Sequence, residues 1–146
     1  MDYTIRKGEE KDFEQVLGLI KELALFEKAP KKVSNTVEQM KKEKDFFKLL
    51  VAEKPGGEII GFALFYFVYY TWVGKSLYLD DLYVKEAYRG NKIGSALLDR
   101  VIDFGKQNHV KRIRWQVLNW NTPAIEFYKK LGANLDDEWI NCDLEE

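Results

Sequence analysis

The sequence predicts a mixed α+β fold, with a central, mostly antiparallel twisted sheet of six to seven strands flanked by about four helices. Long hairpin strands come first and strand–helix alternation comes later, an order typical of a mixed sheet with helices packed on it. The length of 146 residues suits a single domain that spans residues 1–146.

The first half of the chain contains the helices that precede the long strands. Residues 3–7 predict a short strand, and apolar residues at helical spacing predict a helix over residues 9–26. Pro30 ends that helix, and a more polar helix is expected over residues 34–44. A strand over residues 46–53 leads to a turn with two adjacent glycines. The strand that follows, over residues 59–70, is expected to be buried on both faces.

The second half alternates strands and helices. A strand over residues 76–84 precedes an amphipathic helix that opens at residues 89–94, and a strand is expected over residues 111–118. A helix over residues 122–131 follows; Asn121 or Thr122 caps it, and Gly132 ends it. The remaining residues allow one or two short strands, which bring the sheet to six or seven.

Charge and composition exclude several classes of function. The net charge is −1, so no global field gathers nucleic acid or an anionic membrane surface. A single cysteine, Cys142, and a single histidine, His109, form no cluster of metal ligands, so we expect no metal site. The N-terminus resembles a strand rather than a signal peptide, and the apolar run at residues 62–70 is too short to span a bilayer. We therefore expect a cytoplasmic protein with no nucleic acid or membrane partner.

A glycine-containing turn at residues 89–94 is the first candidate binding site. It lies between a predicted strand and a predicted helix, where the first amides of the helix lack an internal partner. Gly90 and Gly94 leave room for a pyrophosphate, and Arg89 and Lys92 add positive charge. The spacing fits neither the dinucleotide nor the Walker pattern, and by itself a plain strand–helix turn stays an alternative.

Two motifs together resemble the acetyl-CoA signatures of the GNAT superfamily of N-acetyltransferases. The first consists of LDDLYV at residues 79–84 followed by RGNKIGS at residues 89–95. The second is WNTPAIEFYKKLGA at residues 120–133. Two further segments, IKELA at residues 20–24 and WVGKSLYL at residues 72–79, are similar to the spermidine/spermine (diamine) and thialysine N-acetyltransferases. The likeness covers nearly the whole chain.

The resemblance implies acetyl-CoA as the cofactor, a small-molecule amine as the substrate, and a homodimer. The residues that it assigns to the cofactor are Leu82, Tyr83, Val84, Arg89, Gly90, Asn91, Lys92, Ile93, Gly94, Ser95, Asn121, Ala124 and Tyr128. The residues that it places towards the amine are Phe26, Glu27, Asp80, Arg114, Trp115 and Gln116.

Three departures from the diamine enzymes bear on the substrate. Asp80 stands where those enzymes have glutamate, lysines within residues 28–32 replace an acidic stretch, and Tyr70 replaces an acidic residue. Because a polycation prefers acidic walls, these changes favour a smaller amine and leave open one that also carries a carboxylate.

We expect direct attack of the amine on the thioester, with Asp80 and Tyr128 as the catalytic residues. Asp80 is the candidate to orient the ammonium and to accept its proton, although a carboxylate with an ordinary pKa of about 3.9 is a weak base. Asp81 is the fallback, but strict alternation along a strand turns it to the other face. Tyr128 is the candidate to protonate the departing sulfur or to donate a hydrogen bond to it, and a backbone amide of residues 82–84 stabilises the oxyanion.

The predicted function is therefore transfer of the acetyl group of acetyl-CoA to a primary amine of a diamine, a polyamine or a thialysine-like amino acid. Two alternatives stay open at this point. One is a CoA-binding sensor or interaction module that lacks catalysis, and the other is an acetyltransferase that acts on protein amines.

Overall fold

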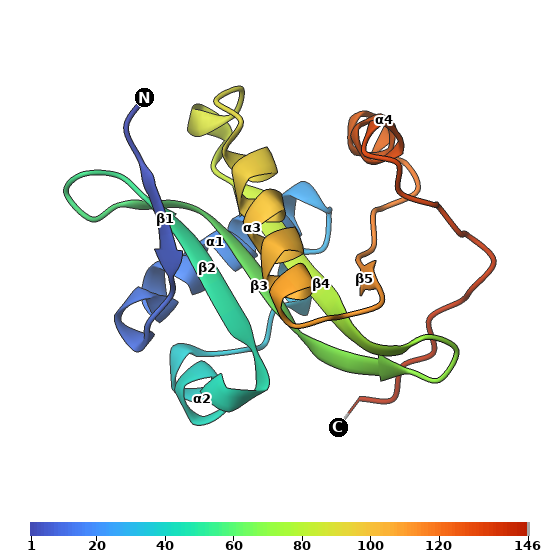
Figure 1. The fold of residues 1–146 in the computed structure, drawn as a ribbon. Helices are drawn as coiled ribbons and strands as arrows, with labels where there is room; N and C mark the ends of the chain where they lie inside the picture. The colour runs from blue at the N-terminus through green and yellow to red at the C-terminus, as the bar shows by residue number, and fades with distance from the viewer. Residues whose placement is uncertain (146) are drawn as a thin grey trace. The chain divides into compact units, whose positions relative to one another are not determined.

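The computed structural model describes residues 1–145, which fall into two units, Met1–Trp115 and residues 116–145. The first unit contains the sheet, and its strands follow one another in chain order across it (Figure 1). They are β1 (Thr4–Lys7), β2 (Lys48–Glu53), β3 (Ile59–Tyr70), β4 (Gly74–Val84) and β5 (Ile113–Arg114). The first four are antiparallel to their neighbours, and β5 runs parallel to β4. The predicted mixed, mostly antiparallel sheet is confirmed.

Helices cover both faces of this sheet. On one face, α1 (Phe13–Phe26) and α2 (Val37–Lys42) enclose a core cluster that includes Phe62 of β3. On the opposite face, α3 (Ile93–Gln107) encloses a second cluster that includes Phe65 (Figure 1). Each helix contributes one apolar side, which its residues form at helical spacing. Short 3-10 helices lie at Glu10–Asp12, Pro30–Lys32, Lys44–Phe46 and Glu86–Tyr88.

The number of strands differs from the prediction, because the described residues form five rather than six or seven. The strand expected over residues 111–118 shortens to Ile113–Arg114, which pairs with only two residues of β4. Residues 133–145 form no strand and bury no side chain; Trp139 and Ile140 are 71% and 87% exposed. Without a buried face, an alternating pattern cannot fix a strand on a sheet.

Strand β3 has the predicted bounds, but only its first part is buried on both faces. Residues 59–63 are buried, whereas Phe67 and Tyr69 are 41% and 75% exposed. The end of the hairpin that this part forms with β4 extends past α3 (Figure 1). The helix predicted over residues 34–44 is also shorter, because Thr36 caps it by accepting the Gln39 amide at 3.1 Å.

The second unit contains α4 (Thr122–Lys130), and its predicted start and end are confirmed. The side chain of Asn121 accepts the Ala124 amide at 3.4 Å, and Gly132 follows the helix with a φ of 87°.

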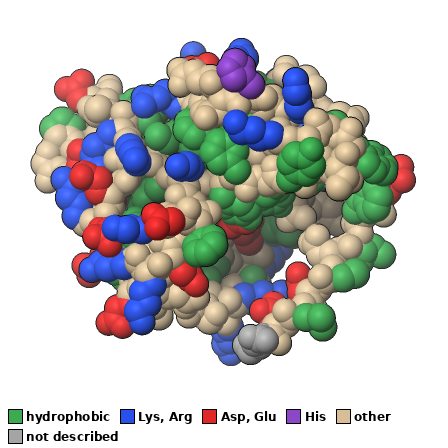
Figure 2. Space-filling model, turned by 60° about the horizontal axis from the view of Figure 1, so that its bottom comes forward, with side chains coloured by type: hydrophobic (Ala, Val, Ile, Leu, Met, Phe, Trp, Pro, Cys, Tyr) green, Lys and Arg blue, Asp and Glu red, His purple; other side chains and the backbone are tan. Residues whose placement is uncertain are grey.

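His109 follows the C-terminal end of α3. It is exposed and takes a left-handed φ of 57°, and the next amide, that of Val110, donates to the Gly105 carbonyl at 3.0 Å (Figure 2). Basic and acidic side chains are interspersed over the left part of the face drawn in Figure 2. Within residues 1–145, no helix has the length and apolar character that a membrane span needs.

Candidate functional site

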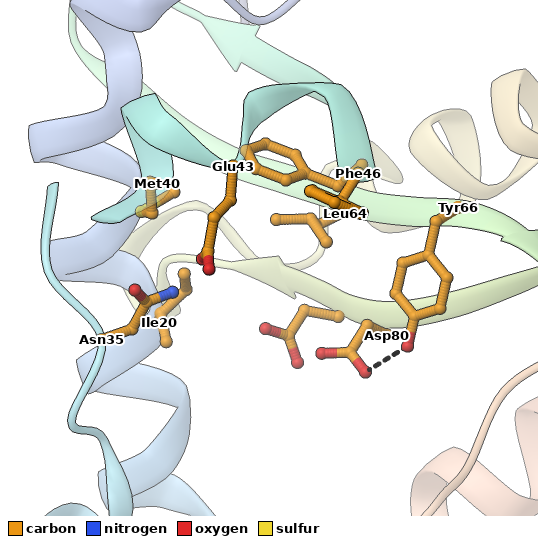
Figure 3. Close-up of a pocket in the computed structure, with 10 residues that line it drawn as sticks. Ile20, Asn35, Met40, Glu43, Phe46, Leu64, Tyr66 and Asp80 are labelled. Carbon is orange, nitrogen blue, oxygen red and sulfur yellow. Dashed lines mark hydrogen bonds between the residues drawn. The ribbon is translucent and has the colours of Figure 1, made fainter. Parts of the chain in front are cut away.

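A cavity of about 450 Å³ opens on the α1 face of the sheet, within the first unit. In Figure 3 the polar ends of Asn35, Glu43 and Asp80 point into the same space from different elements. The lining residues are Ile20, Asn35, Met40, Glu43, Phe46, Phe47, Leu64, Tyr66, Asp80 and Asp81. The wall is therefore mostly apolar, with three carboxylates, and such a cleft attracts a cation with an apolar stem.

A β-bulge in β4 places Asp80 and Asp81 in this cavity together. Leu64 of β3 pairs with Asp81, whereas the next residue, Phe65, pairs with Leu79, so that Asp80 is the extra residue. Before the bulge Leu79 packs in the cluster under α3, and after it Leu82 packs against the same cluster. The two residues between them therefore face the α1 side. The expectation that Asp81 faces away from Asp80 is wrong, because it assumed an unbroken alternation.

The environment of Asp81 suits a proton acceptor. Burial, helped by the charges of Asp80 and Glu27, raises the pKa of Asp81 to about 7. The pKa of Glu27, which follows α1, is also raised, first by burial and then by Asp80. Three carboxylates thus lie within electrostatic reach of one another, which holds one of them close to its titration point at neutral pH.

Two tyrosines adjoin the acidic group on the same face. The hydroxyl of Tyr66 donates to Oδ1 of Asp80 at 3.2 Å (Figure 3). Its ring stacks on that of Tyr78 with centroids 5.8 Å apart. Burial and the charge of Asp80 raise the pKa values of both phenols, so both stay protonated at neutral pH. A neutral phenol that donates to Asp80 fixes the orientation of this carboxylate.

A positively charged group lies along the same strands. The guanidinium of Arg114 lies 4.6 Å from the centroid of the Tyr70 ring, and that of Arg112 lies 5.3 Å from it. Arg114 is opposite Tyr78 in the register of β4 and β5. The sequence placed Arg114 near the amine, but it gave no reason to single out Arg112.

The turn before α3 has the geometry expected of an anion site. Gly90 has a φ of 86°, and Lys92, at the N-cap, has a φ of 60°. Lys92 offers no side-chain acceptor to the first amides of the helix, and the first turn has no acidic residue. A Cβ on Gly94 would meet no atom nearer than Val84 Cγ2 at 3.7 Å. Contacts within the protein therefore do not require glycine at this position, whereas a ligand that approaches the backbone here would require it.

Strand β4 leads from the acidic cavity to this turn with one edge open. It pairs with β5 only at Leu77 and Tyr78. Within the described residues, the part of this edge from 79 to 84 has no strand partner, so its backbone groups are available to an extended ligand.

Two predicted residues, Arg89 and Phe26, contact each other away from the helix amides. Nε of Arg89 donates to the Val84 carbonyl at 3.0 Å. Its guanidinium lies 5.4 Å and 5.6 Å from the ring centroids of Tyr83 and Phe26. Arg89 therefore links the end of β4 to the end of α1.

Other predicted residues lie in different surroundings. Trp115 packs against the cluster under α3, on the face of the sheet opposite the cavity. In the second unit, Gln116 donates to Asn141 Oδ1 at 3.2 Å, and Asn121 caps α4. Burial raises the pKa of Tyr128, whose ring centroid is 5.6 Å from that of Phe127.

Tyr66 and Arg112 were not expected from sequence, and Asp81 was expected only as a fallback that faces the other side of the strand. For Asp81, the signal lies in the apolar pattern: Leu77 and Leu79 before it, and Leu82 and Val84 after it, change from odd to even positions. Such a change of phase is what a bulge produces. No comparable signal exists for Tyr66.

Comparisons with known proteins identify the family of this chain. The model of the acetyltransferase (GNAT) family matches residues 13–133. A thialysine N-epsilon-acetyltransferase of Sus scrofa is 39% identical over 140 residues, covering 88% of this chain and 82% of that protein. The spermidine/spermine N(1)-acetyltransferase-like protein 1 of Homo sapiens is 36% identical, covering 91% of this chain and 21% of that protein.

A solved structure has the same fold. It is a predicted acetyltransferase with acetyl-CoA from Clostridium acetobutylicum, and it superposes with a TM-score of 0.80 at 22% identity. The match covers 97% of this chain and 96% of that one.

Proposed function

This chain belongs to the acetyltransferase (GNAT) family and is an acetyltransferase, and from that premise we propose that it transfers the acetyl group of acetyl-CoA to a primary amine of a small molecule. The observation that carries the proposal is the course of β4, which passes the acidic cavity at Asp80 and Asp81 and ends at the turn before α3. An amine site and a phosphate site are thereby joined by one open strand edge.

The turn before α3 fits the diphosphate of coenzyme A. The amides of Ile93, Gly94 and Ser95 begin the helix without an acidic neighbour, and the dipole of the helix favours a negative charge there. Gly90, Asn91 and Lys92 complete the turn, and Arg89 holds its approach to β4. Residues 82–84 offer their backbone groups to the pantetheine arm; Asn121, Ala124 and Tyr128 are the contacts proposed from the second unit.

Acetyl-CoA, when bound, supplies the acetyl group as a thioester, whose C–S bond breaks as the amine nitrogen forms the C–N bond and coenzyme A leaves with the electron pair. Before this step the ammonium must lose a proton. Transfer from an amine of pKa about 10.4 to a carboxylate of pKa about 3.9 costs about 9 kcal/mol, whereas transfer to one of pKa about 7 costs about 4.6 kcal/mol. Asp81, with its pKa raised to about 7, is therefore the proposed proton acceptor.

Asp80 has a positioning role in this proposal. Its carboxylate accepts the Tyr66 hydroxyl, which leaves Oδ2 to orient the ammonium. Its charge also raises the pKa of Asp81. Glu27 adds to the negative potential that attracts the amine.

Tyr128 is proposed to donate a hydrogen bond to the departing sulfur. Full proton transfer from an ordinary phenol of pKa about 10 to a thiolate of about 8.5 is already uphill by about 2 kcal/mol. Burial raises the pKa of Tyr128 further, so a hydrogen bond is favoured over complete transfer.

The remaining parts of the proposal concern assembly and location. Residues 1–146 would form a single acetyltransferase domain, acting as a homodimer in the cytoplasm without nucleic acid or membrane partners. The resemblance to the diamine and thialysine enzymes supports the dimer, and sedimentation velocity tests it.

The direct test is release of free thiol from acetyl-CoA, measured with and without an added amine. We expect release to depend on the amine and the acetylated amine to appear in equal amount by mass spectrometry. No release above the rate without amine, across diamines, polyamines and thialysine, would contradict the proposal.

A further inference from the structure

We infer that the acceptor amine belongs to an amino acid with an amine at its far end, and that Arg112 and Arg114 bind the carboxylate of this amino acid beside Tyr70. The inference rests on the proposed acetyl transfer and names its substrate class. It makes the two arginines residues that determine specificity.

The two arginines extend from the face of the sheet that carries the cavity. Ile113 packs against the cluster under α3, so its neighbours Arg112 and Arg114 extend from the opposite side. Tyr78 lies between Leu77 and Leu79 of the same cluster, and it faces the α1 side for the same reason. The acidic cavity, the tyrosines and the arginines thus share one surface.

The arginine pair has no counter-ion among residues 1–145. Every ion pair among the described residues is formed by a cation other than these two arginines. Both guanidinium groups instead lie over the ring of Tyr70, at 4.6 and 5.3 Å from its centroid. Two neighbouring guanidinium groups with free donors match the planar geometry of a carboxylate, which each can bind through two hydrogen bonds.

Tyr78 lies between the two charged ends. Burial raises the pKa of Tyr78; the charge of Asp80 raises this pKa further, and the charge of Arg114 lowers it. Both charged groups are therefore within electrostatic reach of the Tyr78 phenol. Asp80 is two residues beyond Tyr78, and Arg114 is opposite Tyr78, which separates the two backbone positions by about 7 Å along the strand.

An amino acid with a distal amine has the matching charge pattern. Six single bonds of about 1.5 Å separate the side-chain nitrogen of a lysine-like molecule from its carboxyl carbon, or roughly 7–8 Å when extended. The exposed, flexible side chain of Arg114 can adjust to that length. A diamine or polyamine would instead bring its second ammonium towards two arginines, which is unfavourable.

The test compares three amines that have the same chain: thialysine, its carboxamide, and the diamine that results from removing its carboxylate. In the wild type we expect kcat/KM to be at least about tenfold higher for thialysine than for the other two, because charge-assisted hydrogen bonds to a carboxylate are of this strength. Equal values for the three amines would overturn the inference.

The variant R112Q/R114Q is expected to lose this preference. The ratio of kcat/KM for thialysine to kcat/KM for the diamine should fall by about tenfold or more. Lys111→Gln is the matched control, because it removes a neighbouring exposed charge next to Arg112, on the other side of the strand. An unchanged ratio in the double variant, or an equal loss in the control, would overturn the inference.

A binding measurement separates this inference from the proposed function. If no amine is acetylated, the proposed function fails, and calorimetry with thialysine and the diamine still tests the arginines. Tenfold weaker binding of thialysine alone in R112Q/R114Q would support the carboxylate site. Unchanged binding of thialysine, or an equal loss for the diamine, would exclude it.

Discussion

Asp80 and Asp81 are neighbours in the chain, and both carboxylates line the same cavity because Asp80 is an extra residue in β4 opposite Leu64 and Phe65. Burial of Asp81 and, after it, the like charge of Asp80 disfavour ionisation of Asp81. The pKa of Asp81 rises to about 7, while Asp80 accepts the hydroxyl of Tyr66. The bulge thereby gives two adjacent carboxylates different roles.

Asp81→Asn is expected to lower kcat/KM by about 100- to 10,000-fold, because an amide cannot accept the proton of the ammonium. In the wild type kcat/KM should rise with pH through about 7, as Asp81 ionises. This rise of kcat/KM with pH, the acidic limb of the pH profile, should be absent in the variant. Initial rates of thiol release between pH 5 and 9 test this, and a variant that keeps both the rate and the limb would remove Asp81 from the mechanism.

Asp80→Asn is expected to move the same limb to lower pH. The charge of Asp80 raises the pKa of Asp81, so its removal lets Asp81 ionise at lower pH. KM for the amine should rise, because the group that orients the ammonium is neutral. A limb that stays in place would show that the two carboxylates do not interact.

Asp81→Asn should also stabilise the fold at pH 8. The pKa of Asp81 is raised in the folded state, so ionisation costs folding free energy that is absent below pH 4 and complete above about pH 7. The gain in Tm at pH 8 should be at least about 2–4 °C, which corresponds to about 1 kcal/mol. No gain is expected at pH 4, and calorimetric scans at both pH values test the difference.

Asp12 provides a stability test remote from the cavity. Its carboxylate accepts two hydrogen bonds of 2.8 Å from Arg6, which lower its pKa, and it joins β1 to the start of α1. Asp12→Asn should cost about 2–3 kcal/mol at pH 7. The stabilisation in the wild type is present above about pH 4 and is lost as the pH falls below it, because the folded-state pKa is lowered.

Urea unfolding at pH 7 and pH 3 measures this effect. Glu10→Gln is the control, because its pair with Lys44 at 3.6 Å is exposed and should contribute less than about 1 kcal/mol. Equal costs for the two variants at pH 7 would contradict a stabilising role of the Arg6–Asp12 pair.

Tyr128→Phe removes the proposed hydrogen bond to the departing sulfur. Turnover should fall by about 100-fold while KM for acetyl-CoA changes little, because the bond matters mainly as the sulfur gains charge. A steady-state titration of acetyl-CoA measures both constants. Near-normal turnover would remove Tyr128 from the mechanism.

Much of the fold could be predicted because it depends on local signals. The bounds of β3, the start of α3 at Ile93 and the cap of α4 at Asn121 follow from apolar periodicity, glycine and capping chemistry. The number of strands could not be predicted, because strand formation at β5 and after residue 133 depends on pairing partners, which the periodicity of a segment does not reveal.

The site was predictable where a motif defines it. The turn at Gly90 and Gly94 lies before α3 as the motif predicts, and Asp80 lies on the strand that leads to it, whereas Asp81 was expected on the wrong face. A one-residue bulge reverses the orientation of the residues after it, and this register is decided between two strands. The surface formed by Tyr70, Tyr78 and Arg114 likewise depends on the pairing of three strands.

Binding of coenzyme A at the turn before α3 is measured most directly by calorimetric titration of the wild type and of Gly94→Ala. A Cβ at Gly94 meets only Val84 at 3.7 Å, and one at Gly18 of α1, the control position, meets no atom within 4 Å. Neither alanine should lower Tm, since alanine suits a helix better than glycine does. We expect Gly94→Ala to weaken binding of coenzyme A by about tenfold or more, with Gly18→Ala binding as the wild type does. Absence of binding by the wild type, or equal affinity in all three proteins, would contradict the account.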